Sequence, residues 1–252
     1  MKKYPILVLS FLFILLLLCG CSATEGDGTP QTKYYETVQG NYDVVIEDLH
    51  IRGYQPHFVI NRSGTNRVEV QADSNIMDLL DVKVDNDKHE IRISLTEKQN
   101  LRPTYFAVTL SCPVKKVELN GNYQIDWSLP EVKNFTATFN GNCEGTILNQ
   151  DLNKYELTAN GTMDVKASGK AEKFTLTMNG KGDFEGYKLE TTSSCKVTVN
   201  GSGNVEITAN GSLYAEINGK GNITYDGDPT ATTKYVNGKG KIQSRADAEK
   251  NK

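Results

Sequence analysis

The sequence predicts an all-β protein whose main part is a parallel β-helix-like coil of about seven rungs, and three repeating features predict it. An Asn-Gly pair returns at steps of 18 to 21 residues, at Asn120, Asn140, Asn160, Asn179, Asn200, Asn218 and Asn237. The residues one and three positions before each Asn are mostly apolar, and the residue between them is polar and often Thr, as in a half-buried strand. A second apolar column follows each pair. A fixed period of about 20 residues is the mark of a repeat architecture.

Stacked coils explain these columns better than hairpins do. Asn-Gly is also a strong signal for a two-residue β-hairpin. Hairpins, however, give no reason for like residues to recur at one step. In a stacked coil they lie above one another at about 4.8 Å per rung. The second column is then a core column, with Ile125, Val165, Phe184, Val205, Ile223 and Ile242 in it and Gly145 as its exception.

The Asn-Gly pairs predict the corners of the coil. Stacked Asn side chains can hydrogen-bond to one another in a ladder, and we expect this ladder to be buried and structural. The Gly after each Asn is expected to supply a positive φ at a sharp turn.

Residues 1–20 are typical of a signal peptide. Lys2 and Lys3 precede a short apolar run that is too short for an ordinary spanning helix. The sequence Leu18-Cys19-Gly20-Cys21 is similar to a bacterial lipobox and predicts Cys21 as the lipidated residue. The alternative is an ordinary signal peptide with a chance Cys.

The residues after the lipobox are small and polar. Residues 21–36 are therefore expected to form a flexible lipoprotein tether. Loss of two lysines with the signal peptide makes the net charge of −3 more negative, so nucleic acid is not an expected partner.

Residues 37–112 contain alternating strand-like segments without the 20-residue period. We expect a smaller N-terminal β-region that caps the open start of the coil, and one helical turn within residues 74–80. The coil occupies residues 113–243, and the charged residues 244–252 are expected to be a disordered tail.

The C-terminal rungs carry a family resemblance. Residues 218–229, Asn-Gly-Lys-Gly-Asn-Ile-Thr-Tyr-Asp-Gly-Asp-Pro, are followed by Asn-Gly-Lys-Gly-Lys-Ile at 237–242. This pattern resembles the end of the putative auto-transporter adhesin head domain, or GIN domain, found in Bacteroidetes lipoproteins. The resemblance extends over roughly residues 40–243 and is looser before residue 115. Gly-Lys-Gly stands where the family often has Gly-Ser-Gly. The resemblance implies a β-helix-like fold and an adhesin-like role in the cell envelope.

The sequence offers no convincing catalytic set. It has no nucleophile elbow, HExxH motif or phosphate loop, and we expect no cofactor and no metal site. Stacked acids at Glu144, Asp164 and Asp183 could bind calcium, but a solvated edge offset by nearby lysines is the preferred interpretation. Cys112, Cys143 and Cys195 are interpreted as small buried residues, and a disulfide stays open.

The aromatic residues are the remaining candidates for ligand contact. Tyr187, Tyr214 and Tyr235 are predicted to face outward, and with Trp127 they could stack on sugars.

The sequence therefore favours a non-enzymatic, lipid-anchored envelope protein, on either side of the outer membrane, that binds glycan or protein through its coil. A polysaccharide-active β-helix enzyme and a structural or sensory envelope component remain the alternatives.

Overall fold

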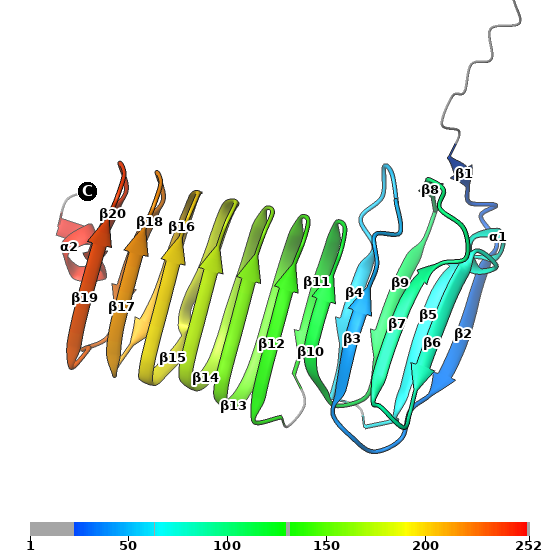
Figure 1. The fold of residues 1–252 in the computed structure, drawn as a ribbon, viewed down its shortest axis with the longest axis horizontal. Coiled ribbons are helices and arrows are strands. Elements are labelled where there is room, and N and C mark those ends of the chain that lie inside the picture. The colour runs from blue at the N-terminus through cyan, green and yellow to red at the C-terminus, as the bar shows by residue number, and fades with distance from the viewer. Residues whose placement is uncertain (1–22, 63, 130–131, 251–252) are drawn as a thin grey trace, which may run out of the picture.

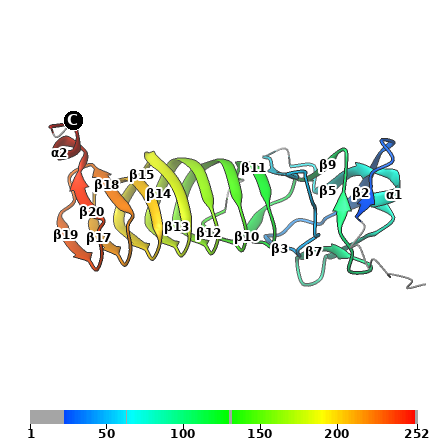
Figure 2. The same ribbon diagram turned by 90° about the horizontal axis from the view of Figure 1, so that it is seen from above.

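The computed structural model describes residues 23–250 except 63 and 130–131, and this part of the chain is an elongated coil of two sheets (Figure 1). Seen from above, successive turns follow one another along a single axis (Figure 2). The predicted all-β parallel coil is confirmed.

Sheet 1 contains the strands that lead up to the Asn-Gly corners. From the N-terminal end of the coil it consists of β6 (Leu80–Asp85), β7 (Glu90–Leu95), β3 (Tyr42–Ile46), β10 (Val114–Leu119), β12 (Asn134–Phe139), the second halves of β13 (Cys143–Ala159), β14 (Met163–Met178) and β15 (Lys181–Val199), β17 (Ser212–Ile217) and β19 (Ala231–Val236).

Sheet 2 contains the strands that follow the corners. It consists of β2 (Pro30–Glu36), β5 (Arg67–Asp73), β9 (Phe106–Leu110), β4 (His57–Ile60), β11 (Tyr123–Ser128), the first halves of β13 to β15, β16 (Ser202–Ala209), β18 (Asn222–Asp226) and β20 (Lys241–Ser244). Outside the two sheets, β1 (Thr24–Glu25) pairs with β8 (Leu101–Arg102).

The strand register follows the columns of the repeat. In the repeat region every pairing of the described strands is parallel, and Leu157 lies opposite Leu176, which lies opposite Val197. The hairpin alternative is therefore excluded for these rungs.

Aromatic side chains fill the space between the sheets. Trp127, Phe135, Tyr155, Phe174 and Phe184 form a chain in which neighbouring ring centroids are 5.2 to 6.0 Å apart. All five are at most 1% exposed. Trp127, which we considered as a sugar-stacking residue, is thus a core residue whose Nε1 donates to the carbonyl of Phe58 at 3.1 Å.

The corner glycines serve a different purpose from the one expected. Of the glycines in the seven Asn-Gly corners, only Gly121 has a positive φ. At the others, the backbone of the preceding rung occupies the space of a side chain. A Cβ on Gly161 would lie 2.1 Å from the carbonyl oxygen of Gly141, and one on Gly180 would lie 1.8 Å from that of Gly161. Close approach of rungs, rather than left-handed backbone, requires glycine here.

The exception in the core column has the same explanation. A Cβ on Gly145 would lie 1.9 Å from the carbonyl oxygen of Ile125, and Gly145 also has a φ of +142°.

The N-terminal β-region covers the start of the coil, as predicted, and it also supplies rungs. Parallel pairs connect β3 to β10 and β4 to β11, so that Val44 and Ile46 extend the core columns of Val117 and Leu119. The antiparallel strands β2, β5 and β6, with helix α1 (Ser74–Met77), then close the end of the coil (Figure 1). Whether residues 37–112 form a separate domain stays a prediction.

Two segments that we expected to lack structure are ordered in the described part of the chain. Residues 30–36 of the expected tether form β2, because their backbone pairs along its whole length with β5. Arg245–Lys250 of the expected tail form helix α2, where Arg245 contacts Asp226 at 3.2 Å and Glu249 at 3.1 Å.

Candidate functional site

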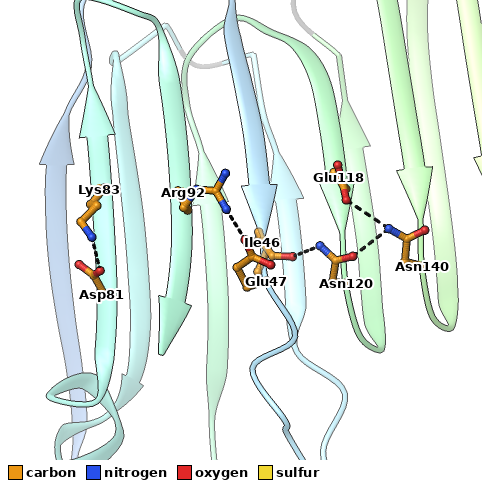
Figure 3. A network of polar contacts seen from close by, with 8 residues as sticks. All are labelled: Ile46, Glu47, Asp81, Lys83, Arg92, Glu118, Asn120 and Asn140. Carbon is orange, nitrogen blue, oxygen red and sulfur yellow. Dashed lines mark hydrogen bonds and ion pairs between the residues drawn. The ribbon is translucent and has the colours of Figure 1, made fainter. Parts of the chain in front are cut away.

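The seven corner asparagines form one continuous ladder. Each amide nitrogen donates to the side-chain oxygen of the preceding Asn, at 2.7 to 2.9 Å. The first member, Asn120, donates instead to the carbonyl of Ile46 at 3.1 Å, beside the ion pair of Arg92 and Glu47 (Figure 3). The ladder is not buried as expected: Asn120 is half-buried and the other six are exposed. It connects successive rungs along the exposed edge of the coil.

Two of the three predicted tyrosines meet at the C-terminal end of sheet 1. Tyr214 on β17 and Tyr235 on β19 are diagonal neighbours, with ring centroids 5.8 Å apart and planes at 49°. Tyr235 is 52% exposed. The Nζ atom of Lys196 lies 5.3 Å from the centroid of Tyr214. Tyr214 is half-buried, so the surface here presents one exposed ring and one partly covered ring with a cation at its side.

A fixed carboxylate lies beside this tyrosine pair. Glu216 accepts a hydrogen bond from the hydroxyl of Tyr214 at 2.8 Å and another from the amide of Asn218 at 2.9 Å. These bonds, first that of Asn218 and then that of Tyr214, lower the pKa of Glu216, and Lys196 adds to the effect. The hydrogen bond to Glu216 in turn raises the pKa of Tyr214. The group can accept hydrogen bonds from ligand hydroxyls near neutral pH.

The third tyrosine is separate from this pair. Tyr187 lies on the sheet 2 side, where the guanidinium carbon of Arg245 stands 4.6 Å from its ring centroid. Burial, followed by the charge of Glu206, raises the pKa of Tyr187, and Arg245 opposes the shift. Helix α2 thus forms one wall of a cleft of about 860 Å³ over sheet 2. This wall could not be predicted from the sequence, because a short charged terminus has no periodic pattern.

The stacked acids act within the coil. The carboxylate of Asp164 accepts the backbone N–H of Asp183 at 2.9 Å, and Asp183 accepts the backbone and amide N–H groups of Asn204 at 3.2 and 2.9 Å. No group of three or more His, Cys, Asp or Glu side chains suited to a metal ion occurs among residues 23–250 where they are described.

A second cleft, missed by sequence reasoning, lies at the N-terminal corners. The connection between β3 and β4 projects beside the corners at 120–122 and 140–141 and encloses a cleft of about 430 Å³. A cleft of about 360 Å³ lies next to it and shares Asn122. No repeat signals this site, because the connection has no counterpart on later rungs.

Cys112, Cys143 and Cys195 are free and buried, at most 3% exposed. Burial raises the pKa of Cys112 to about 11 and that of Cys195 to about 12. The predicted lipidation residue Cys21 and the signal peptide lie outside the described residues. Within the described part of the chain, no helix has the length and apolar character needed to cross a bilayer.

Comparison with known proteins supports the fold. A putative adhesin from Bacteroides fragilis superimposes with a TM-score of 0.67 and 18% identity, over 88% of this chain and 100% of that one. A putative lipid binding protein from Parabacteroides distasonis gives 0.62 and 20% identity, over 88% and 99%, and a putative adhesin from Parabacteroides merdae gives 0.57 and 19%, over 88% and 98%. At these identities the likeness shows the fold alone.

No curated protein sequence matches this chain. The model of the family described as putative auto-transporter adhesin, head GIN domain, matches residues 55–229, which is more than half of the chain. The match covers the coil from β4 to β18 and six of its seven Asn-Gly corners, and the chain belongs to this family.

Proposed function

We propose that this protein is a non-enzymatic, lipid-anchored protein of the cell envelope that binds a glycan or a protein through the surface of its coil. The observation that carries the proposal is the surface pair of half-buried Tyr214 and exposed Tyr235, with Lys196 and Glu216 around it. Stacking aromatic rings next to hydrogen-bonding groups is a common way to bind the apolar face and the hydroxyls of a sugar, and Tyr is frequent at protein interfaces as well.

The position of this pair fits presentation to a partner. The N-terminal strands β1 and β2 lie at one end of the coil, and β19 lies at the other (Figure 1). Nine strand spacings separate the outermost strands of sheet 1, which at about 4.8 Å each is roughly 43 Å. A lipid on Cys21 would hold the first end at the membrane and leave the tyrosine pair at the distal end.

The acids of sheet 2 support a non-enzymatic role. Glycoside hydrolysis uses a pair of carboxyl groups, one of which donates a proton. Asp164 and Asp183 instead accept hydrogen bonds from the next rung, at 2.9 to 3.2 Å, which is a structural use of the carboxylates.

The interior of the coil does not support binding of a lipid chain. The structural relative from Parabacteroides distasonis carries the name of a lipid binding protein. In this chain, side chains such as Trp127 and Phe174 fill the space between the sheets among the described residues.

A glycan array tests the proposal. The soluble chain of residues 22–252 would be applied with and without calcium, and each ligand found would be titrated by calorimetry. Tyr214→Ala and Tyr235→Ala are each expected to weaken binding about tenfold or more, as for aromatic residues at the centre of an interface. Tyr34→Ala is the matched control, because Tyr34 is also exposed (55%), also lies beside a cation, Arg67 at 4.7 Å, and belongs to the opposite end.

Equal weakening by all three substitutions would refute the role of the tyrosine pair. Release of a cleaved product, detected by mass spectrometry, would refute the non-enzymatic assignment. If no glycan binds, the glycan ligand is refuted, and a pulldown from envelope extracts with the same variants tests the protein partner.

A further inference from the structure

The connection between β3 and β4 is longer than any of the Asn-Gly corners of the coil. It runs over residues 47–56, whereas the corner between β10 and β11 takes only residues 120–122. In Figure 1 it extends beyond the line of the other corners. A segment of this length is absent from the Asn-Gly corners and requires a separate explanation.

This connection is held in one conformation. The carbonyl of His50 accepts the N–H of Leu101 at 3.1 Å, and the N–H of Arg52 donates to the carbonyl of Leu101 at 2.8 Å. His50 has a φ of +49°, which is uncommon for a residue other than glycine. Its N–H donates to Asp48 at 2.8 Å, and its Nδ1 lies 3.3 Å from the same carboxylate. The walls of the adjoining cleft are therefore pre-formed.

The 430 Å³ cleft between this connection and the corner ridge contains mixed hydrogen-bonding groups. Its polar lining comes from Asp48, His50, Arg52, Asn122, Tyr123 and Asn140. This volume is within the range of small-molecule sites, about 300–1,000 Å³. Asp48 and Arg52 bring one charge of each sign to this cleft.

Tyr123 is the second indication of a ligand. It is 2% exposed, and the end of its ring lies beside Gly121 and Asp48, both of which line the cleft. Tyr123 lines the cleft, and its hydroxyl makes no hydrogen bond to the described residues, so it is free to bond to a ligand there. Burial, and then the charge of Asp48, raises the pKa of Tyr123, so the hydroxyl remains a proton donor.

The neighbouring cleft extends the same surface. Asn122 belongs to both clefts, and the second adds Tyr54, Gln55, Asn142, Glu144, Thr162 and Asp164. The side-chain oxygen of Asn122 accepts the N–H of Asn142 at 3.1 Å, which leaves its amide NH₂ group without a partner among the described residues. Donors and acceptors thus follow one another along the corner ridge.

We propose that this corner groove, formed by the two clefts on either side of Asn122, binds a neutral, hydroxyl-rich ligand, namely a saccharide of more than one ring. Sugar hydroxyls donate to the carboxylate of Asp48 and accept from Asn122 and Tyr123. The carboxylates of Asp48, Glu144 and Asp164 outnumber the guanidinium of Arg52 in this groove, which disfavours an anionic ligand. The inference rests on the proposed binding function and adds a site distinct from the distal tyrosine pair.

Removal of single hydroxyl and amide groups tests the groove. The full chain, purified in mild detergent, would be titrated with the glycans that the array identifies. Tyr123→Phe and Asn122→Ala are each expected to weaken saccharide binding about three- to tenfold, since each removes about one hydrogen bond. Tyr155→Phe is the matched control, because the hydroxyl of Tyr155 likewise has no hydrogen-bond partner but is buried in the core between the sheets.

Tyr123→Phe leaves the ring in place, so its melting temperature is expected to match that of Tyr155→Phe and to exclude unfolding as a cause. The groove is refuted if the Tyr123 and Asn122 variants bind as wild type while Tyr214→Ala and Tyr235→Ala lose binding, and in that case the proposed function stands. If the wild type binds no saccharide, the groove and the glycan ligand are both refuted. If the groove variants alone lose binding, the groove is supported and the tyrosine pair is not the site.

Discussion

Substitution of Gly180 by Ala tests why the corners of this coil contain glycine. The added Cβ would lie 1.8 Å from the carbonyl oxygen of Gly161 and 2.7 Å from its carbon. Relief of this clash requires the two rungs to separate by about 1 Å or more, since van der Waals contact needs roughly 3.5 Å.

The cost can be estimated from the contacts at this corner. Overpacking costs about 1–3 kcal/mol. Separation of the rungs also weakens the hydrogen bonds from Lys181 N–H to Gly161 at 3.1 Å and from Ser202 N–H to Gly180 at 3.0 Å, each worth about 1 kcal/mol. The free energy of unfolding is therefore expected to fall by about 3 kcal/mol, which for a chain of this size lowers the Tm by roughly 6–12 °C.

Two further glycine substitutions separate steric from conformational causes. Gly53 has a φ of +70° and no atom within 4 Å of an added Cβ, so Gly53→Ala should cost only about 1 kcal/mol for left-handed backbone. In Gly238→Ala the added Cβ would lie 2.0 Å from the carbonyl oxygen of Gly219, but the last rung can move outward. The free energy of unfolding should therefore fall less for Gly238→Ala than for Gly180→Ala.

Urea unfolding of residues 22–252 measures these differences. Fluorescence of Trp127, the single tryptophan, reports the core, and circular dichroism reports the strands. A loss for Gly180→Ala no greater than that for Gly53→Ala would refute close rung approach as the reason for these glycines.

Three other predictions concern the ladder, a buried carboxylate and the thiols. Asn179→Ala removes the hydrogen bond that Asn179 donates to Asn160 at 2.7 Å and the one that it accepts from Asn200 at 2.8 Å. In urea titration the free energy of unfolding should fall by about 1 kcal/mol. An unchanged free energy of unfolding would refute a stabilising role for the ladder. Asp73 is 1% exposed, and although burial acts to raise its pKa, hydrogen bonds from Thr104, Tyr105 and Gly28 lower it. The stabilisation by the Asp73 carboxylate is therefore complete above the unfolded pKa of about 3.9 and is lost as the pH falls through the lower folded pKa. Urea titrations should show that acidification lowers the free energy of unfolding less for Asp73→Asn than for wild type. An equal decrease in the two proteins would contradict this. Because burial raises the thiol pKa values, the three described cysteines should react with Ellman's reagent at pH 8 only after unfolding, and rapid reaction of the native protein would show that they are accessible.

The repeat was predictable because stacking places one constraint on every rung. Val117, Leu157 and Val197 must each fill the same narrow space between two sheets, so their shared position is visible in the sequence. The N-terminal rungs escaped prediction for the opposite reason. Phe58 fills the same core column as Ile125, but the connections around it vary in length and hide the period.

The candidate surfaces were predictable only in part. Tyr214 and Tyr235 lie four and two positions before their corner asparagines, so outward orientation followed from strand alternation, and their contact followed from the stacking of adjacent rungs. Tyr187 lies just before the chain passes back to sheet 1 and is not part of a repeating column of residues. Its contact with Arg245 depends on helix α2 at the C-terminus, so the sequence did not predict it.

By itself, the sequence determined the all-β class, the coil with about seven corners, the core columns and the family, because each rests on a pattern that recurs along the chain. Only the tertiary structure decided that corner glycines allow close approach, that the Asn ladder is exposed, that β3 lies between β7 and β10, and that residues 47–56 form a groove with the corner ridge. These features depend on contacts between segments far apart in the chain. The conformation of each of these segments depends on the segment that it contacts in space, and a local sequence pattern does not indicate which segment that is.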